Sequence, residues 1–211
     1  MKQDERFRFI MDGFVPTPQQ VEQYIADTEK HIDDVRRELL YNVIPKLEER
    51  AEKHDASKLV EPELSGFIQL AEAMKLSDHA YGSPEYRENL ARYKTVILEH
   101  YRVNDHHPEH FSNPETGEPT LAAMDLLSIL EWLCDGFAAS QRHGDKADYA
   151  ESLWIQRERF SIQSDLFTII WHTAVALGFV SDPDGHEFYE AHARCKANGR
   201  CQREVSDYSD D

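Results

Sequence analysis

Residues 17–43, Thr17-Pro-Gln-Gln-Val-Glu-Gln-Tyr-Ile-Ala-Asp-Thr-Glu-Lys-His-Ile-Asp-Asp-Val-Arg-Arg-Glu-Leu-Leu-Tyr-Asn-Val43, carry the clearest structural signal in the chain. Apolar residues recur there at the spacing of one face of an α-helix: Val21, Ile25, Ile32, Val35, Leu39 and Val43. Thr17 is a predicted N-cap, with Pro18 at the first helical position and Gln20 three residues after the cap. We therefore expect a long amphipathic helix that runs to about Pro45 or, kinked there, on toward Lys53.

Four further segments have helical periodicity or helix-start signals. They are a short helix that starts at Glu61-Pro62-Glu63 and runs through about Met74, a helix opened by Ser83-Pro84-Glu85 that ends near His100, a core helix over about 120–140, and a long last helix over about 147–177. We find no strand alternation and no internal repeat. The sequence thus predicts an all-α fold of five or six principal helices. The expected divisions are an N-terminal arm (1–16), one helical domain (17–180) and a polar C-terminal tail (181–211).

Composition limits the classes of partner. The chain has 211 residues, 40% of them hydrophobic, and a net charge of −17. Such a charge opposes non-specific attraction to nucleic acids and anionic lipid, so a small molecule or another protein is the expected partner. No stretch approaches the roughly 20 apolar residues that span a bilayer, nor is there the apolar core of a signal peptide, so we expect a cytoplasmic protein.

The three cysteines do not predict a disulfide framework. Cys134 lies in an apolar helical stretch and is expected to be a buried thiol, while Cys195 and Cys201 lie in the polar tail. With His186 and His192 they supply four potential zinc donors, but their spacing matches no known zinc knuckle, so zinc binding there is left open.

The densest chemistry lies in His100-Tyr-Arg-Val-Asn-Asp-His-His-Pro-Glu-His110, which holds four of the eleven histidines. His100 follows Leu90, Tyr93 and Ile97 at helical spacing, so it should lie on the buried face of its helix. Neutral imidazole is the commonest protein ligand of transition metals. This segment therefore predicts part of a metal site, although a single buried histidine is often only a hydrogen-bonded core residue.

Further potential ligands form an ordered set along the chain: His31, His54-Asp55, His100, His106-His107 and Asp135. This set resembles the HD-domain superfamily over about residues 28–140. The superfamily is an all-α fold in which a histidine, a His-Asp doublet and a distant aspartate converge on a divalent metal. Members with two metals add two histidines between the doublet and the last aspartate.

The resemblance implies a role for each residue. His31, His54, Asp55 and Asp135 would hold a first metal, and Asp55 would bridge to a second metal held by His100 and either His106 or His107. Mixed nitrogen and oxygen donors suit Mn, Fe, Co, Ni or Zn, so one or two such ions are the expected cofactor. Outside the ligand set, Glu131 is a candidate to orient a ligand histidine. Lys58 is a candidate contact for a substrate phosphate, with Arg102 as a helper.

A more local resemblance covers three motifs, His54-Asp-x-Ser-Lys58, Asn104-x-His-His-Pro-Glu-His110 and Glu131-Trp-Leu-Cys-Asp135. Together they are similar to DUF5662, a family found in bacteria and bacteriophages to which no function is attached. This resemblance implies only that the three motifs belong to one site.

Three function classes follow as hypotheses. The first is a metal-dependent phosphohydrolase acting on a small nucleotide, in which metal-activated water hydrolyses a phosphate ester or anhydride. The second is a di-iron oxygenase, because the HD superfamily also contains such enzymes with a similar set of six ligands. The third is a non-catalytic protein that binds a nucleotide or a partner protein.

Overall fold

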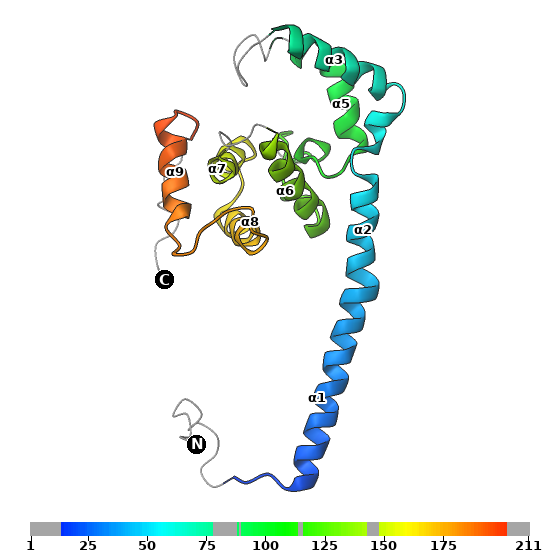
Figure 1. Cartoon of the computed structure of the whole chain (residues 1–211), viewed down its shortest axis with the longest axis vertical. Coiled ribbons are helices and arrows are strands. Elements are labelled where there is room, and N and C mark those ends of the chain that lie inside the picture. The colour runs from blue at the N-terminus through cyan, green and yellow to red at the C-terminus, as the bar shows by residue number, and fades with distance from the viewer. Residues whose placement is uncertain (1–13, 78–87, 89, 114–115, 143–147, 202–211) are drawn as a thin grey trace. The chain divides into compact units, whose positions relative to one another are not determined.

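The computed structural model describes residues 14–77, 88, 90–113, 116–142 and 148–201 (Figure 1). Its regular elements are all helices, and an isolated antiparallel bridge joins Ser112 to Pro119. The all-α prediction is therefore confirmed. The chain divides into two units, residues 1–49 and 50–211. None of the described helices is both long enough and apolar enough to cross a membrane.

The long helix that the sequence predicted begins in the first unit, and its last residues belong to the second unit. Helix α1 (Pro18–Glu38) continues through a short π-helix, η2 (Leu39–Val43), into α2 (Ile44–Lys53). Thr17 caps α1 as expected: its hydroxyl oxygen accepts from the Gln20 backbone N–H, and the Gln20 side chain accepts from the Thr17 backbone N–H. The predicted arm falls almost entirely on residues 1–13, outside the described residues.

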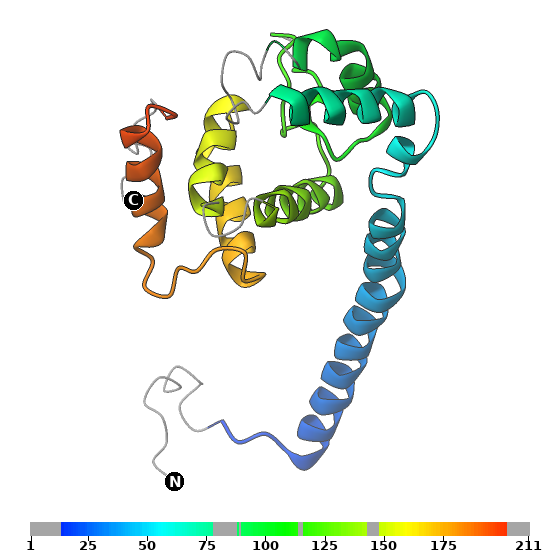
Figure 2. The ribbon, with the colours of Figure 1, turned by 45° about the horizontal axis from the view of Figure 1, so that its top comes forward.

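The second unit holds the remaining helices (Figures 1 and 2). They are η3 (Ala56–Leu59), α3 (Glu63–Ser77), α5 (Lys94–Val103), η4 (Pro108–His110), α6 (Leu126–Gln141), α7 (Tyr149–Arg159), α8 (Ser164–Ala176) and α9 (Glu187–Ala197). The core is formed mainly by α6 to α9, with Leu133, Trp154, Phe167 and Trp171 almost fully buried. Helix α3 packs against α5, and α7 packs against α9. The predicted helix start at Ser83 lies outside the described residues.

The predicted single helix over 147–177 is wrong in one respect, because it is broken between α7 and α8. Ser161 has a positive φ of 50°, which a helix cannot contain. The turn buries Phe160 and Ile162 on either side of it, at 5% and 3% exposure. Burial of these two apolar side chains favours the break over a continuous helix.

The C-terminal segment also differs from the predicted polar tail. Residues 187–197 form α9, whose Ala191, His192 and Cys195 are buried. Cys195 and Cys201 form a disulfide, and His192 stacks on Trp154 with ring centroids 4.1 Å apart. Sulfur atoms joined to each other are not thiolate ligands, which argues against the zinc site that was left open. Cys134, expected to be buried, is exposed on α6.

Candidate metal centre

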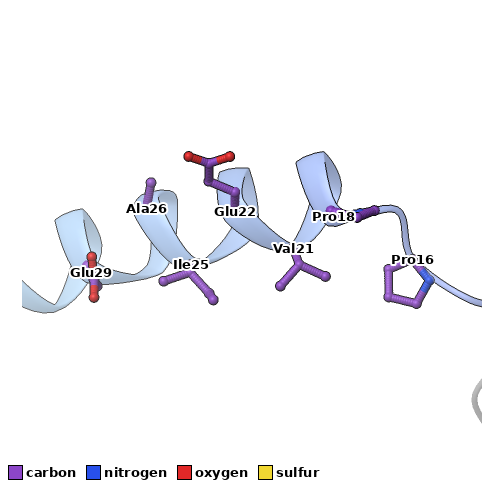
Figure 3. A pocket seen from close by; sticks show the side chains of 7 residues that line it. All are labelled: Pro16, Pro18, Val21, Glu22, Ile25, Ala26 and Glu29. Carbon is purple, nitrogen blue, oxygen red and sulfur yellow. The ribbon is translucent and has the colours of Figure 1, made fainter.

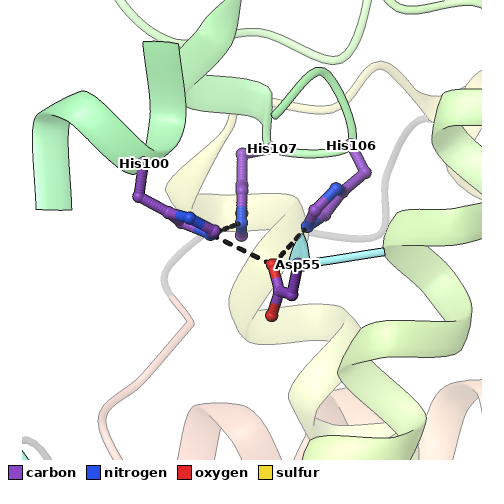
Figure 4. A group of neighbouring side chains, drawn as sticks. All are labelled: Asp55, His100, His106 and His107. Atoms are coloured by element: carbon purple, nitrogen blue, oxygen red, sulfur yellow. Dashed lines mark hydrogen bonds and ion pairs between the residues drawn. The ribbon is translucent and has the colours of Figure 1, made fainter. Parts of the chain in front are cut away.

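Separate segments of the second unit bring the ligand residues together. His54 and Asp55 follow the C-terminal end of α2, where Asp55 adopts a left-handed backbone conformation (φ 54°). His100 lies in the last turn of α5, and the chain then turns back so that His106 and His107 face it (Figure 4). Asp135 lies on α6, one turn after Glu131. A left-handed aspartate is uncommon, and this conformation places the Asp55 carboxylate among the histidines.

The first ligand group consists of Asp55, His100, His106 and His107, whose donor atoms all lie within 4.8 Å of one another. Oδ1 of Asp55 is 3.2 Å from Nε2 of His100 and 3.5 Å from Nε2 of His106. Nε2 of His100 is 2.9 Å from Nε2 of His107. Ligand atoms bound about 2 Å from one ion are at most about 4 Å apart, so the three distances of 3.2, 3.5 and 2.9 Å suit a single metal.

A second group consists of His54, His106 and Asp135. Nε2 of His54 is 3.7 Å from Oδ1 of Asp135 and 3.6 Å from Oδ2 of Asp55. The two groups thus share His106, and the two oxygens of Asp55 point one toward each group. The arrangement offers two neighbouring metal positions with Asp55 between them.

Two carboxylates hold three of the histidine rings by their outer nitrogens. Nδ1 of His100 is 2.9 Å from Oε2 of Glu63, while Nδ1 of His54 and Nδ1 of His106 are 2.8 and 3.1 Å from the same oxygen, Oε1 of Glu131. A carboxylate accepts only from a protonated nitrogen. Each of these rings therefore has a hydrogen on Nδ1 that points to the carboxylate, and its Nε2 faces the cluster as the possible metal donor.

A buried polar network fixes the Glu63 side of the site. The Ser57 hydroxyl donates to Oε2 of Glu63 at 2.9 Å, and the Asn104 side-chain amide donates to Oγ of Ser57 at 2.9 Å. The same amide donates to the His100 backbone carbonyl at 2.8 Å. Because Glu63 is only 4% exposed and His100 only 2%, these bonds leave His100 little freedom to turn.

Two cations border the ligands. Arg50 contacts two other segments: its Nη2 is 2.6 Å from Oδ1 of Asp105 and its Nε is 2.6 Å from Oε2 of Glu131. Lys58 lies 2.5 Å from Oδ2 of Asp55 and over the ring of Phe67. Its side chain remains 34% exposed, so the ammonium is within reach of a dissolved ligand.

The electrostatics favour ionised carboxylates and a neutral histidine. Burial raises the pKa of Asp55, but contacts with His100 and Lys58 outweigh burial and hold that pKa well below its usual range. Burial also raises the pKa of Glu131, but its bonds to His106 and His54 outweigh this and lower it to about 2. Burial, with neighbouring His106 and His100, lowers the pKa of His107 to about 3. These are the protonation states that metal binding requires.

Among the buried side-chain polar atoms of the described residues that lack a hydrogen-bond partner, two belong to the ligand set. They are Oδ1 of Asp55 and Nε2 of His106. An unpaired carboxylate oxygen and an unpaired imidazole nitrogen, buried 3.5 Å apart, are costly unless something binds both. The residues present therefore fit a divalent transition metal.

The structure brings some of the predicted site residues together and places others elsewhere. His54, Asp55, His100 and Asp135 come together as expected. Both His106 and His107 join the cluster, where we had expected one of them as ligand.

Two predicted site residues, His31 and Arg102, have other surroundings in the structure, and His110 was not predicted as a ligand. His31 is exposed on α1, in the first unit, and belongs to neither ligand group. Its role as a ligand stays a prediction. Arg102 is 68% exposed and pairs with Glu99 on the same helix, so nothing in its described contacts supports a role in the site. His110 is exposed, and its ring bonds to the Tyr101 carbonyl.

Sequence reasoning missed Glu63 and Arg50 as parts of the site. Neither has a distinctive local pattern: Glu63 is one of three charged or proline residues that begin a short helix, and Arg50 is one of several charges near the end of α2. Ser57 and Asn104 stand within the quoted motifs, but their hydrogen bonds become visible only in three dimensions.

Comparison with known proteins places the chain in a family. A family model described as a family of unknown function (DUF5662) matches residues 20–175, which includes every residue of the cluster. No curated protein and no solved structure shows significant similarity to the chain.

Proposed function

The chain belongs to this family of unknown function, and we propose that it is a metal-dependent phosphohydrolase acting on a small nucleotide. The observation that carries the proposal is the convergence of Asp55 with Nε2 of His100 and His106, each ring held at Nδ1 by a carboxylate. These contacts leave each Nε2 directed at the cluster, where it could serve as a metal ligand. The choice of a nucleotide phosphate comes from the resemblance of the ordered ligand set to the HD superfamily, which itself remains a proposal.

In the proposed reaction, water adds to phosphorus, the phosphorus–oxygen bond to the leaving group breaks, and the leaving oxygen takes up a proton. Divalent ions bound at the cluster would lower the pKa of water and neutralise phosphate charge. The protein residues hold the ions and orient the substrate. Asp55 would bridge the two positions, because its two oxygens face different ligand groups.

Lys58 is the proposed phosphate contact. Its ammonium is partly exposed and lies beside Asp55, so a phosphate at the cluster would be within reach of a positive charge. Asp55 and Lys58 are ion-paired before substrate binds, which holds the lysine at the site. Lys58→Gln should therefore reduce phosphate release with little loss of bound metal, and Lys58→Arg should restore part of it.

The test is a panel of nucleoside monophosphates, triphosphates and cyclic nucleotides, incubated with protein loaded with Mn²⁺ or Co²⁺ and scored for phosphate and nucleoside. We expect Asp55→Ala to abolish release while leaving the far-UV circular dichroism unchanged. Asp184→Ala, in an exposed loop, is the matched control and should retain activity. Activity that persists in metal-free Asp55→Ala protein would refute the proposal.

The donor set also favours a second candidate, a di-iron oxygenase. Four histidines and two aspartates in two adjoining groups are donors that iron accepts as readily as the other candidate metals. Anaerobic purification followed by iron analysis and oxygen-uptake measurements separates the two enzymes. Two iron ions per chain with substrate-dependent oxygen uptake would favour the oxygenase, while tight nucleotide binding without any product would favour a non-catalytic binder.

The proposed location remains the cytoplasm, where small nucleotides are abundant. One observation weighs against it: the Cys195–Cys201 disulfide, since such bonds are rare in reducing compartments. Thiol titration of protein isolated without reductant tests the location, because a cytoplasmic protein should yield all three cysteines as free thiols.

A further inference from the structure

Helix α1 has an apolar face that no described residue of its own unit covers. None of its residues is buried, and Val21, Ile25, Ile32 and Val35 are each between 41% and 49% exposed. Figure 3 shows Val21 and Ile25 projecting from the same side of the helix, beside a shallow hollow that begins at Pro16. Isolated apolar residues on a surface are ordinary, but a continuous stripe along a helix usually marks a binding face.

The local interactions of α1 are too weak to account for a stable exposed helix. Thr17 and Gln20 form the capping box, and Arg36 and Arg37 pair with Asp33 and Asp34 one turn earlier. Surface pairs of this kind contribute little to the stability of a helix. Helices in proteins owe most of their stability to packing of an apolar face, so α1 is expected to have a partner.

The spacing of the stripe indicates what kind of partner fits. From Val21 the face continues at alternating steps of four and three: Val21, Ile25, Thr28, Ile32, Val35 and Leu39. This is the 3.5-residue repeat of a coiled-coil seam, which packs against another seam of the same kind. The repeat ends at the π-helix η2, where the number of residues per helical turn changes. We propose that α1 forms an antiparallel two-helix pair with α1 of a second copy of the chain.

The antiparallel orientation follows from the charges beside the seam. When the seams are aligned end to end, Val21 packs against Leu39 of the second copy, Ile25 against its Val35, and Thr28 against its Ile32. Every seam position then has a partner. Glu22 follows Val21, and Arg36 lies one turn before Leu39. In the antiparallel pair, Glu22 of one copy therefore lies beside Arg36 of the other copy, and this contact occurs once at each end of the pair.

A parallel pair lacks this match. Each seam residue would meet its own counterpart, and Glu22 and Arg36 would lie about 21 Å apart along the axis, since 14 residues separate them. In the antiparallel pair the two copies of Glu29 face each other near the centre, a like-charge contact that moderates the affinity. Arg36 already pairs with Asp33 on its own helix, with both side chains 62% exposed, and can exchange that pairing at little cost.

Light scattering coupled to size-exclusion chromatography of the full chain tests the proposal, with sedimentation at several concentrations for the dissociation constant. We expect a dimer at about 100 µM for the wild type, since a short exposed seam is consistent with micromolar affinity. Ile32→Asp should raise the dissociation constant at least roughly tenfold, because it places a charge in the seam. Gln23→Asp, on the outward face, is the matched control and should leave the dimer intact.

Charge reversal tests the orientation and does not depend on the seam itself. Glu22→Arg and Arg36→Glu should each weaken the dimer by roughly fivefold to tenfold, as expected for two pairs turned from attractive to repulsive. The double variant should restore wild-type affinity. A double variant as weak as the singles excludes the antiparallel pair. Two results exclude self-association through α1: a wild-type chain that stays monomeric, or an Ile32→Asp variant that dimerises normally. Either result leaves the second unit of the same chain as the surface that covers this face.

Discussion

Oε1 of Glu131 lies 2.8 Å from Nδ1 of His54. The same oxygen lies 3.1 Å from Nδ1 of His106, so one carboxylate sets the tautomer of two histidines that belong to different chain segments. His106 is common to both ligand groups and His54 belongs to only one. Glu131 therefore links the two candidate ligand groups although it belongs to neither of them.

Replacing Glu131 should weaken metal binding at both positions. In Glu131→Gln the side-chain oxygen can still accept from one ring, but the amide group competes for the other, so one imidazole loses its orientation. We expect a loss of about 10–100-fold in Co²⁺ affinity, measured from the visible absorption of the bound ion. Glu99→Gln, on the surface of α5, is the control. Unchanged affinity in Glu131→Gln would show that the carboxylate has no orienting role.

Glu131 should also make the metal-free protein sensitive to acid. The pKa of a carboxyl group lowered from 4.5 to about 2 in the folded state adds stability that is complete above pH 4.5 and lost as the pH falls toward 2. The full contribution is about 3 kcal/mol at most. The test is urea unfolding of protein freed of metal by a chelator, measured from about pH 6 to about pH 3. Over this range the unfolding free energy of the wild type should fall more steeply with decreasing pH than that of Glu131→Gln. Parallel pH profiles would contradict the lowered pKa.

The local helical signals were sufficient to predict most of the fold. The capping box at Thr17 and the apolar period of α6 depend on residues close in sequence, so they were visible in the chain alone. The break at Ser161 was not, because the 3.6-residue period continues on both sides and only the burial of Phe160 and Ile162 shows why the chain turns. Helix α9 was not predicted because most of its residues are polar or charged and only a narrow face of the helix is buried, so its apolar periodicity in the sequence is weak.

The sequence likewise predicted part of the candidate site. The residues of the two groups could be chosen from the sequence because they form an ordered set of metal-binding residue types that resembles a known pattern. Glu63 was not found, since a glutamate at a helix start is ordinary and its bond to His100 joins residues 37 positions apart. The choice between His106 and His107 could not be made from sequence, because only the turn after α5 brings both rings to the same point (Figure 4).

Arg50 should act as a clamp, by which we mean that its ion pairs hold together the three segments that carry the candidate ligands. It lies one turn before His54, contacts Asp105 in the loop that carries His106, and contacts Glu131 on the helix that carries Asp135. Arg50→Gln removes both ion pairs, and we expect it to weaken Co²⁺ binding about tenfold. Arg50→Lys should recover only part of this, because one ammonium cannot reach both carboxylates with the geometry of a guanidinium.

The control for Arg50 is Arg102→Gln, which removes an exposed arginine that pairs only with Glu99 among its described contacts. This variant should bind Co²⁺ like the wild type and, if Arg102 plays no part in the reaction, should hydrolyse substrate at the same rate. Equal metal affinity in Arg50→Gln and Arg102→Gln would mean that the three segments hold their positions without the clamp.

Asp135 should distinguish one metal position from two. It belongs only to the group with His54 and His106, whereas Asp55, His100 and His107 form the other group with His106. Asp135→Asn keeps the side-chain shape but removes the charge, so it should lower the bound metal from two ions per chain to one, measured by elemental analysis after dialysis. His100→Gln, which disrupts the first group, should remove the other ion. If both variants and the wild type bind a single ion, the cluster is one site whose histidines compete for it, and the proposed bridging role of Asp55 is wrong.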